Sequence, residues 1–502
     1  MHALSPPRPI ILLLSLAVVV LFGCRRDELF TDDPGASLDF TQDTVLFDTI
    51  FTTVGSVTKR FVARNLGDQA VRVNIALEGG SPSPFRINVD GASGISFSDV
   101  EILGGDSIYV FVEATLDQSN TNNPLIIEDR ILFNTNGNEQ EVLLVAWGQD
   151  AHFFYPDRAI QGFPRFSIIA GLDDNGGTTC ETVVWPNDKP YVIYGYAVVD
   201  SCSTLRIEPG VRVYVHGGGG LWIYRWGRIQ AEGTLEDPIT FQSDRLEPLY
   251  AELPGQWDRI WINDGPAGQD NSLVNVVVKN ALVGIQCETW PLIPDAPTSA
   301  AQLVLNNVSI RNCSAAGILS RNYRITSNNL LVGDCGQYSV ALTGGGEYYF
   351  NHSTIANYWN YGIRQTPAFI LTNTYQDITG ALQIREVESS EFVNGIVYGS
   401  NVNEFQLSFD AALQPQVTFD RYLIRTDQPT DNATIFPFPD RIYRNQNPGF
   451  LSPGDRDFRL AESAFARNKG TSSTIEAIND LQGNLRNCDG LGFDLGCFEW
   501  CP

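Results

Sequence analysis

One pattern of apolar and polar positions returns three times between Leu303 and Arg364, at intervals of 22 and 23 residues. Single apolar residues stand among Asn, Asp and Gly, without the spacing of a helix. A period of this length is typical of a β-solenoid in which each repeat forms one coil. The apolar columns should point inward, and the Asn and Gly columns should mark corners, because these residues tolerate left-handed backbone. The aligned columns are Asn306/Asn328/Asn351, Ile310/Val332/Ile355, Asn312/Asp334/Asn357, Gly317/Ser339/Gly362 and Ile318/Val340/Ile363.

Alternation of apolar and polar residues also marks the coils that should precede this repeat. The dipeptide Pro209-Gly210 indicates a corner between two strands. The alternation around it predicts four inward-facing side chains, Leu205, Ile207, Val211 and Val213.

These patterns predict a solenoid over residues 191–447, entered through a connector at residues 151–190. Residues 289–300, rich in Pro and Ala, interrupt the period and should form an outward loop. Longer loops are expected at 401–447. Residues 448–502 should form a cap, because an open coil end exposes unpaired strand backbone.

The residues before the connector have a different sequence pattern, in which short strands are separated by turn residues. Seven or eight strands in about 110 residues predict a β-sandwich over residues 39–150. The expected strands are 44–53, 58–65, 71–77, 85–89, 100–102, 107–114, 129–135 and 140–147.

The first 24 residues have the pattern of an export signal. Arg8 precedes an apolar run of about 13 residues, too short to span a bilayer of roughly 30 Å as a helix. Leu21-Phe22-Gly23-Cys24 resembles a bacterial lipobox, whose Cys becomes the lipidated first residue, although Phe22 departs from the usual small or aliphatic residue. The alternative is ordinary signal-peptidase cleavage with Cys24 as an unmodified thiol. Residues 25–38 are polar and are interpreted as a flexible tether.

The residues after Cys24 bear on where the protein lies. Arg25-Arg26-Asp27-Glu28 resembles the short tag that follows the lipid cysteine in surface-exported lipoproteins of Bacteroidota. That resemblance implies a lipid-anchored outer-membrane protein that faces the exterior. A formal charge of -25 and a pI near 4.5 argue against nucleic acid and against charge-driven binding of anionic lipid. The lipid chain would therefore make the membrane contact, and we expect a monomer.

Composition supports an all-β fold. The chain has 45 Gly, 27 Pro and one Met among 502 residues, with few stretches of helical periodicity. Its fold class is therefore predicted as all-β, with an N-terminal β-sandwich, then a parallel solenoid, then a C-terminal cap.

Eight cysteines remain when Cys24 is set aside, an even number that an oxidising compartment would allow to pair. Cys313 and Cys335 share a place in the repeat, so neighbouring coils should bring them to about 4.8 Å, within disulfide reach. A stacked pair of free buried thiols fits that place equally well. Cys–X–X–Cys spacing is absent, so a zinc site is not expected. The disulfide candidates are Cys180, Cys202, Cys313, Cys335, Cys488, Cys497 and Cys501.

Three stretches resemble parts of known families. Residues 205–241 resemble the entry coils of bacterial right-handed parallel β-helix proteins, and residues 54–65 resemble the opening of an immunoglobulin-like domain. Residues 447–499 resemble the terminal segment of many β-helix surface proteins. Together they resemble the uncharacterised right-handed parallel β-helix lipoproteins of Bacteroidota. The resemblance implies an immunoglobulin-like sandwich followed by a right-handed β-helix, but no particular activity.

Polysaccharide lyases and hydrolases share the solenoid fold, so catalytic groups were sought. The aligned coils hold no ladder of carboxylates. The best cluster is Asp244-Arg245 with Asp258-Arg259 one coil on, and its alternative is an exposed, salt-bridged turn. Asp173-Asp174-Asn175-Gly176-Gly177 could hold Ca²⁺, but it lacks spaced ligands and a distal Glu, so a turn is favoured. No other cofactor is expected.

Aromatic residues make a stronger case for binding. Flat rings on a rigid β-face can stack on sugars, and the alternative is that they fill the interior or pack beneath loops. The candidates are Trp222, Tyr224, Trp226, Trp257, Trp261, Tyr358 and Trp359. Two hypotheses follow. The favoured one is a non-catalytic surface lipoprotein that binds a polysaccharide or another surface partner. The other is a polysaccharide lyase or glycosidase with its cleft between residues 289–300 and 401–447.

Overall fold

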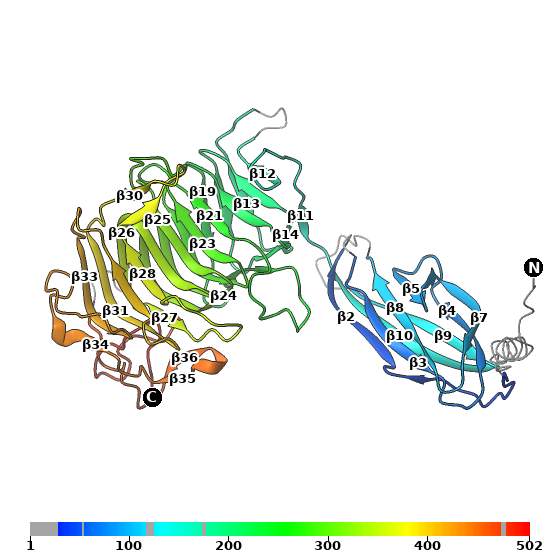
Figure 1. Cartoon of the computed structure of the whole chain (residues 1–502). Helices are drawn as coiled ribbons and strands as arrows, with labels where there is room; N and C mark the ends of the chain where they lie inside the picture. The colour runs from blue at the N-terminus through cyan, green and yellow to red at the C-terminus, as the bar shows by residue number, and fades with distance from the viewer. Residues whose placement is uncertain (1–28, 53–54, 117–124, 173–176, 473–477) are drawn as a thin grey trace, which may run out of the picture. The chain divides into compact units, whose positions relative to one another are not determined.

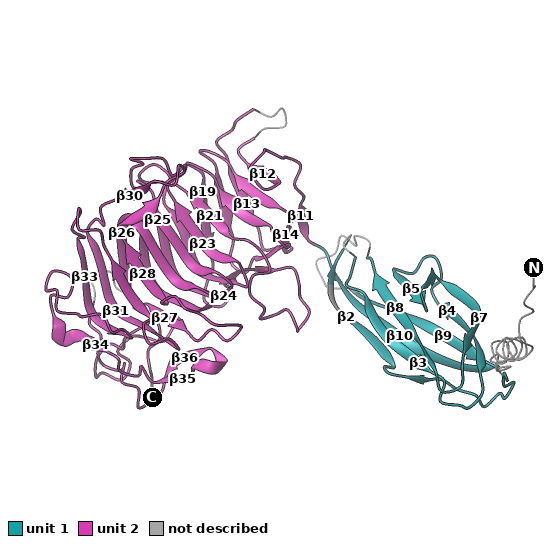
Figure 2. Ribbon diagram, in the orientation of Figure 1, with its two compact units in different colours: residues 1–150 teal, residues 151–502 magenta. Residues whose placement is uncertain are grey.

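The computed structural model (Figure 1) describes the chain except for residues 1–28, 53–54, 117–124, 173–176 and 473–477. The described residues form β-strands and two short 3-10 helices, Pro439–Arg441 and Pro453–Asp455, and contain no α-helix. The prediction of an all-β protein is therefore confirmed. The chain divides into two compact units, residues 1–150 and 151–502 (Figure 2).

The first unit contains two five-stranded sheets that share one apolar core. Phe61 of one sheet and Phe133 of the other meet in that core with their ring centroids 6.2 Å apart. One sheet has the order β1 (Asp39–Phe40), β3 (Lys59–Arg64), β8 (Ser107–Ala114), β5 (Phe85–Val89), β6 (Ala92–Gly94). The other has the order β2 (Thr44–Phe51), β10 (Asn138–Gln149), β9 (Leu125–Thr135), β4 (Val71–Leu77), β7 (Ser96–Ile102).

Residues just before this unit differ from the expected flexible tether. The main-chain N–H of Thr31 donates to Ala70 O at 3.0 Å, and the Arg72 guanidinium lies 4.1 Å from the centre of the Phe30 ring. Leu38 is buried in the core. Apolar side chains within the polar stretch therefore tie residues 29–38 to the sheets, and the tether prediction is wrong for them.

The second unit is built on one 22-stranded sheet in which every pairing is parallel. Its first strands pair with the strand three places on, as β16 does with β19 and β17 with β20. In Figure 1 the sheet extends from β11 and β14 through β23 to β31 and β33, as the colour passes from green to orange. The sheet begins at β11, so residues 151–190 are part of it and not a separate connector. Its strands are β11 (His152–Phe154), β12 (Phe166–Ala170), β13 (Thr182–Trp185), β14 (Tyr191–Ile193), β15 (Tyr196–Val199), β16 (Thr204–Ile207), β17 (Arg212–Val215), β18 (Gly220–Ile223), β19 (Arg228–Glu232), β20 (Ile239–Ser243), β21 (Ile260–Asn263), β22 (Asn271–Lys279), β23 (Val283–Glu288), β24 (Gln302–Cys313), β25 (Ala316–Cys335), β26 (Tyr338–Asn351), β27 (Thr354–Asn357), β28 (Phe369–Thr372), β31 (Ser390–Gly399), β32 (Phe405–Ser408), β33 (Val417–Ile424) and β34 (Ile442–Arg444).

The predicted inward columns of this sheet are largely present. Ile310 pairs in register with Val332, and Val332 with Ile355, and all three are fully buried. The inward positions around Pro209-Gly210 are also buried, namely Leu205, Ile207, Val211 and Val213. Stacked apolar side chains thus form one continuous core along the unit.

The last column ends earlier than predicted. Val340 pairs with Phe369, not with Ile363, whose residue surface is 93% exposed. The chain leaves the sheet after β27 and returns at β28, and the buried Arg364–Glu404 ion pair anchors the intervening loop. Gly362 and Ile363 therefore belong to a loop, and the sequence alignment fails for them.

Corner residues follow the prediction in one column and are shifted by one position in another. Asn312 and Asp334 have left-handed backbone, as predicted. Left-handed backbone occurs at Asn307, Asn329 and His352, next to the predicted Asn306, Asn328 and Asn351. The side-chain amide of Asn329 donates to Asn307 Oδ1 at 2.8 Å, 22 residues away. Asparagine thus serves twice at these corners, since it tolerates the bend and links successive layers.

Gly317 was expected at a left-handed corner, but its φ angle is not positive. A Cβ atom there would lie 2.3 Å from Val332 Cγ1. Close packing, and not backbone conformation, therefore explains this glycine.

The C-terminal segment, residues 448–502, was expected to cap the open end of the sheet. It runs instead along the side of the sheet. Asn329 Nδ2 donates to Asn479 O at 2.8 Å, and Arg456 Nε lies 3.0 Å from Asp334 Oδ2. The last core layer is instead covered by Phe436, whose ring centre is 5.7 Å from that of Phe419. Two small hairpins lie outside the large sheet, β29 (Thr374–Gln376) with β30 (Leu382–Ile384) and β35 (Phe450–Ser452) with β36 (Asp457–Leu460).

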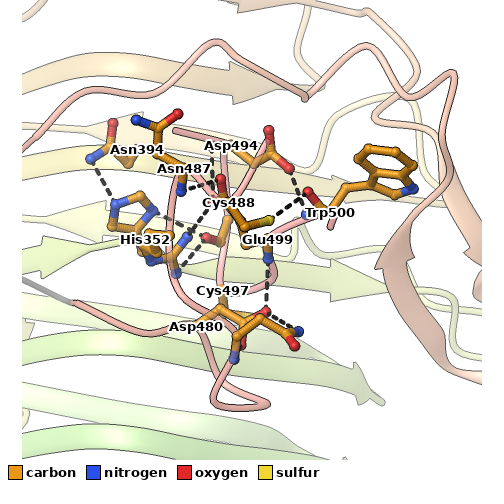
Figure 3. A network of polar contacts seen from close by, with 12 residues as sticks. His352, Asn394, Asp480, Asn487, Cys488, Asp494, Cys497, Glu499 and Trp500 are labelled. Carbon is orange, nitrogen blue, oxygen red and sulfur yellow. Dashed lines mark hydrogen bonds and ion pairs between the residues drawn. The ribbon is translucent and has the colours of Figure 1, made fainter. Parts of the chain in front are cut away.

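Buried polar groups attach the C-terminal segment to the corner residues Asn329 and His352 (Figure 3). The Arg486 guanidinium donates to Asn329 Oδ1 at 2.5 Å and pairs with Glu499 at 3.3 Å. His352 contacts Gly496 O at 3.3 Å through Nδ1 and the Asn394 amide at 3.2 Å through Nε2. Burial, followed by the nearby Arg486 charge, holds the pKa of His352 well below 6.5.

This depressed pKa predicts an acid-sensitive contribution to stability. Below pH 6.5 the unfolded His352 takes up a proton that the native histidine refuses, so the free energy of unfolding should fall by up to about 1.4 kcal/mol per pH unit. His352→Asn should remove this contribution, because Asn occupies the equivalent corners at Asn329 and Asn394. Urea unfolding of both proteins at pH 7.5, 6.0 and 5.0 measures the difference. Equal pH dependence in the two proteins would contradict the prediction.

Within the described residues two disulfides form, Cys180–Cys202 and Cys488–Cys501. Cys313, Cys335 and Cys497 are free and buried, so their candidacy for disulfides is corrected. Cys313 and Cys335 are neighbours in register and stay free. The alternative prediction, a stacked pair of buried thiols, therefore holds for them. The hydrogen bond with Cys335, followed by burial, raises the pKa of Cys313, so its thiol stays protonated.

Candidate functional site

Two tryptophans stack on the outward side of neighbouring strands. Trp222 of β18 pairs in register with Trp261 of β21, and their rings lie 4.6 Å apart at 11°. Phe163 packs on the other side of Trp222 at 5.7 Å, and Trp290 meets the edge of Trp261 at 5.2 Å. Trp222 is therefore buried, whereas Trp261 and Trp290 remain partly exposed.

Polar side chains surround Trp261 on the same side of the sheet. Arg259 lies two residues before it in an extended segment, so both side chains point outward. Trp261 Nε1 donates to Glu288 Oε1 at 2.7 Å. Gln286 joins the two ends of this arrangement, because it accepts from Arg259 and donates to Glu288. The tryptophan face is defined here as Trp222, Trp261, Trp290, Arg259, Gln286, Glu288 and Arg321.

The charges of the tryptophan face differ in exposure. Arg321 pairs with Glu288 at 2.9 Å, and its side chain is 35% exposed against 1% for the carboxylate. Arg259 pairs with Asp258 at 2.8 Å. Burial opposes the charge of Arg259, but hydrogen bonding to Asp258 outweighs it and raises the arginine's pKa. Ligands would therefore meet guanidinium donors before they meet Glu288.

The structure brings together four predicted site residues, Trp222, Trp261, Asp258 and Arg259. Tyr196 also belongs here, since its hydroxyl donates to Asp258. Burial, with the Asp258 charge as the next cause, raises the pKa of that tyrosine. Its hydroxyl is thus a fixed donor and not a base at neutral pH.

Trp226 lies at the edge of the same face. It is 53% exposed in the turn after β18, where it has left-handed backbone, and its N–H donates to Asp264 O at 2.9 Å. The Asp264 side chain in turn accepts the main-chain N–H of Trp290 at 2.9 Å. Tyr224 lies just beyond the end of β18, is partly buried, and meets the Trp222 ring edge-on at 5.3 Å.

The remaining aromatic candidates lie elsewhere. Trp257 is buried in the core, and its Nε1 donates to Lys279 O at 2.9 Å, so its candidacy for glycan binding is corrected. Tyr358 packs on Phe458 at 6.0 Å, and Trp359 on Tyr361 at 5.2 Å.

The weak catalytic candidates separate into two groups. Asp244 accepts from His216 at 2.7 Å. Arg245 pairs with Glu247 at 3.1 Å and lies 3.7 Å from the centre of the Tyr250 ring. Neither residue has a described contact with Asp258 or Arg259. The proposed four-residue cluster therefore does not form, because the two pairs bind different partners.

Sequence reasoning missed Phe163, Gln286, Glu288, Trp290 and Arg321. What brings these residues to the site is the register of the parallel strands. Trp261 pairs with Gln286, and Glu288 pairs with Arg321. Those two pairings connect residues 25 and 33 positions apart, and the second crosses the irregular insertion at 289–300. No repeat spacing identifies them.

That insertion starts at the tryptophan face and reaches a different loop from the one expected. Tyr375 Oη donates to Ile293 O at 3.1 Å, and Ile378 N donates to Leu292 O at 2.9 Å. Both partners belong to the region of the β29–β30 hairpin and not to residues 401–447. The described contacts therefore give no support to a cleft between the insertion and 401–447.

An acidic pocket lies over β24, β25 and β26. Its volume is about 390 Å³, and its lining includes Asp270, Arg324, Glu347, Tyr349 and Glu391. Arg324 pairs with Glu347 at 3.0 Å. Residues 401–447 contribute nothing to the lining. Three carboxylates and one guanidinium therefore line this pocket.

The described part of the chain contains no group of three or more His, Cys, Asp or Glu side chains arranged to hold a metal ion. Of the possible Ca²⁺ loop, residues 173–176 lie outside the described residues. Within the same part of the chain, no helix has the length and apolar character needed to cross a membrane.

No protein-family model and no curated protein matches the chain. A family 123 glycoside hydrolase from Clostridium perfringens, described for glycolipid glycan hydrolysis, is similar with a TM-score of 0.17 and 9% identity. The match covers 22% of this chain and 26% of that one. PapD-like domain 7 of human CEP192 is similar with a TM-score of 0.17 and 12% identity, over 26% of this chain and 97% of that one. Likenesses at this level carry no argument about function.

Proposed function

We propose that the protein is a surface lipoprotein whose second unit binds a glycan, without catalysis, at the tryptophan face. One observation carries the proposal: partly exposed Trp261 is held by its stack on Trp222 and its hydrogen bond to Glu288. A fixed aromatic face beside planar hydrogen-bonding groups suits a pyranose ring, which has an apolar side and hydroxyls on its edge.

The same proposal assigns the second unit to the right-handed parallel β-helices. Its support is the parallel pairing of each early strand with the strand three places on, and the stacked apolar columns inside. The first unit would be an immunoglobulin-like sandwich that holds the β-helix away from the membrane. Its support is the pair of five-stranded sheets around one core.

Attachment is proposed through a lipid on Cys24, with the protein facing outward from the outer membrane of a member of the Bacteroidota. The support is the sequence pattern of residues 8–28, which lie outside the described residues. A Cys24→Ala variant that stays in the membrane fraction after expression in the native host would contradict this part.

The binding test uses the full chain without its signal. Affinity electrophoresis through neutral and uronic-acid polysaccharides should show retention on at least one, and Trp261→Ala should raise the Kd for it at least tenfold, or about 1.4 kcal/mol. Phe438→Ala is the control, because Phe438 is an exposed aromatic residue of the same unit away from this face. Retention that survives Trp261→Ala unchanged would overturn the proposal.

A second candidate function is glycoside hydrolysis in the acidic pocket. The favouring observation is the set of Asp270, Glu347 and Glu391 around a cavity of about 390 Å³, since hydrolases require two carboxylates. Release of reducing ends that disappears in Glu391→Gln, with glycan retention unchanged, would favour this function over the first. Absence of reducing ends across the same polysaccharides would remove it.

A further inference from the structure

One pocket lies in the first unit, which the proposed function treats only as a spacer. Its volume is about 670 Å³, within the usual range for small-ligand sites. It lies on the outer side of β5, β6 and β8. The lining residues are Thr58, Arg86, Ile87, Asn88, Ser93, Gly94, Ile95, Phe111 and Glu113.

An aromatic side chain lines this pocket. Phe111 is partly buried on the outward side of β8 and stacks with Tyr109 at 6.1 Å and 27°. The Arg60 guanidinium lies 5.4 Å from the centre of the Tyr109 ring. Cross-strand pairing places Asn88 directly beside Phe111, and Arg86 beside Glu113. The pocket therefore combines an aromatic surface with planar polar groups.

Those polar groups are fixed before any ligand arrives. Arg86 Nη1 donates to Ser83 O at 2.5 Å and to Phe85 O at 2.6 Å. Asn88 Nδ2 donates to Ser93 Oγ at 3.0 Å, and Thr58 Oγ1 donates to Glu113 Oε1 at 2.5 Å. Side chains held in this way lose little conformational entropy when they bind a ligand.

The charge of the pocket selects a class of ligand. Arg86 and Glu113 give one positive and one negative side chain in the lining, while the whole chain has a formal charge of -25. A strongly charged ligand would leave one of the two facing a like charge. A neutral molecule with many hydroxyls can donate to Glu113, accept from Arg86, and lay an apolar side on Phe111.

We propose that the first unit carries a second glycan-binding site, which takes neutral sugar residues on Phe111 between Arg86, Asn88 and Glu113. This site is independent of the tryptophan face. The first unit would then share in recognition, and two linked sites would raise the overall affinity for a polysaccharide by making the second binding event intramolecular.

The experiment is calorimetry on the full chain without its signal, with cellohexaose, xylohexaose, mannohexaose and maltohexaose as probes. Trp261→Ala silences the tryptophan face, and this variant should still bind at least one hexasaccharide. Adding Phe111→Ala should raise the remaining Kd at least tenfold. Adding Leu132→Ala instead should leave the remaining Kd unchanged, because Leu132 is an exposed apolar residue on the other sheet.

Hydrogen exchange on the wild-type chain provides a readout that does not depend on how the variants fold. The same hexasaccharide should slow exchange in β5 and β6 but not in β9. Loss of all binding in Trp261→Ala would overturn this second site and leave the proposed function standing. Loss of all binding in Phe111→Ala alone would support the second site and overturn the proposed function. Exchange that is slowed by an added extended peptide, and not by any hexasaccharide, would also overturn the second glycan-binding site.

Discussion

Glu404→Ala is expected to lower the free energy of unfolding of the second unit by about 3–5 kcal/mol, among the largest effects of any single change in the protein. The Glu404 and Arg364 side chains are 0% and 2% exposed and lie 2.5 Å apart. Glu404 also accepts the main-chain N–H groups of Ala368 at 3.0 Å and Asn401 at 2.7 Å. Alanine would leave a buried guanidinium without its counter-charge and two donors without an acceptor.

The cost should come from the unpaired charge and not from loss of an attractive pair. Arg364→Met combined with Glu404→Leu should therefore recover most of the lost stability in urea unfolding, because the double variant buries no charge. Glu101→Ala is the matched control, since it breaks a half-exposed ion pair with Arg72 and should cost under about 1 kcal/mol. Equal losses in Glu404→Ala and the double variant would show that the charge is not the cause.

Arg486→Met is expected to release the C-terminal segment from the side of the sheet. The guanidinium is almost fully buried and holds Glu499 at 3.3 Å, Asn329 Oδ1 at 2.5 Å and Gly496 O at 3.2 Å. Its loss removes a partner of Glu499, whose pKa burial already raises to about 7. We expect a loss of about 3–5 kcal/mol in the stability of this contact.

The measurement for Arg486→Met is hydrogen exchange, which reports local opening. Amides of residues 478–500 should exchange at least a hundredfold faster, while those of β16 to β20 should not change. Arg459→Ala is the control, because Arg459 pairs only with Asp457 at the surface. Uniformly faster exchange across the unit would contradict the expectation of a local release.

Patterns of the amino-acid sequence predicted the regular parts of this fold well. β4, β5 and β8 begin and end where the alternation and the turn residues place them. β1 and β6 were missed, since two or three residues carry no readable period. The loop around Ile363 was misread, because the chain there keeps the spacing of the repeat while its backbone leaves the sheet.

The candidate site was less accessible from the sequence. Trp222 and Trp261 were found because aromatic residues are conspicuous, and Trp257 was wrongly added for the same reason. Only the packing shows that Trp257 points into the core while Trp261 points outward. In parallel layers, one position of register decides which face a side chain occupies.

By itself the sequence determined what is local and repeated: the strands, the bends that Asn and Gly allow, and the inward columns such as Ile310/Val332/Ile355. Tertiary structure alone decided which residues meet across irregular insertions. It joined Trp261 to Glu288, Arg364 to Glu404 and Arg486 to Glu499, pairs from 13 to 40 residues apart. The physical reason is that burial, not spacing, selects such partners, since a desolvated charge must find its counter-charge wherever the fold places one.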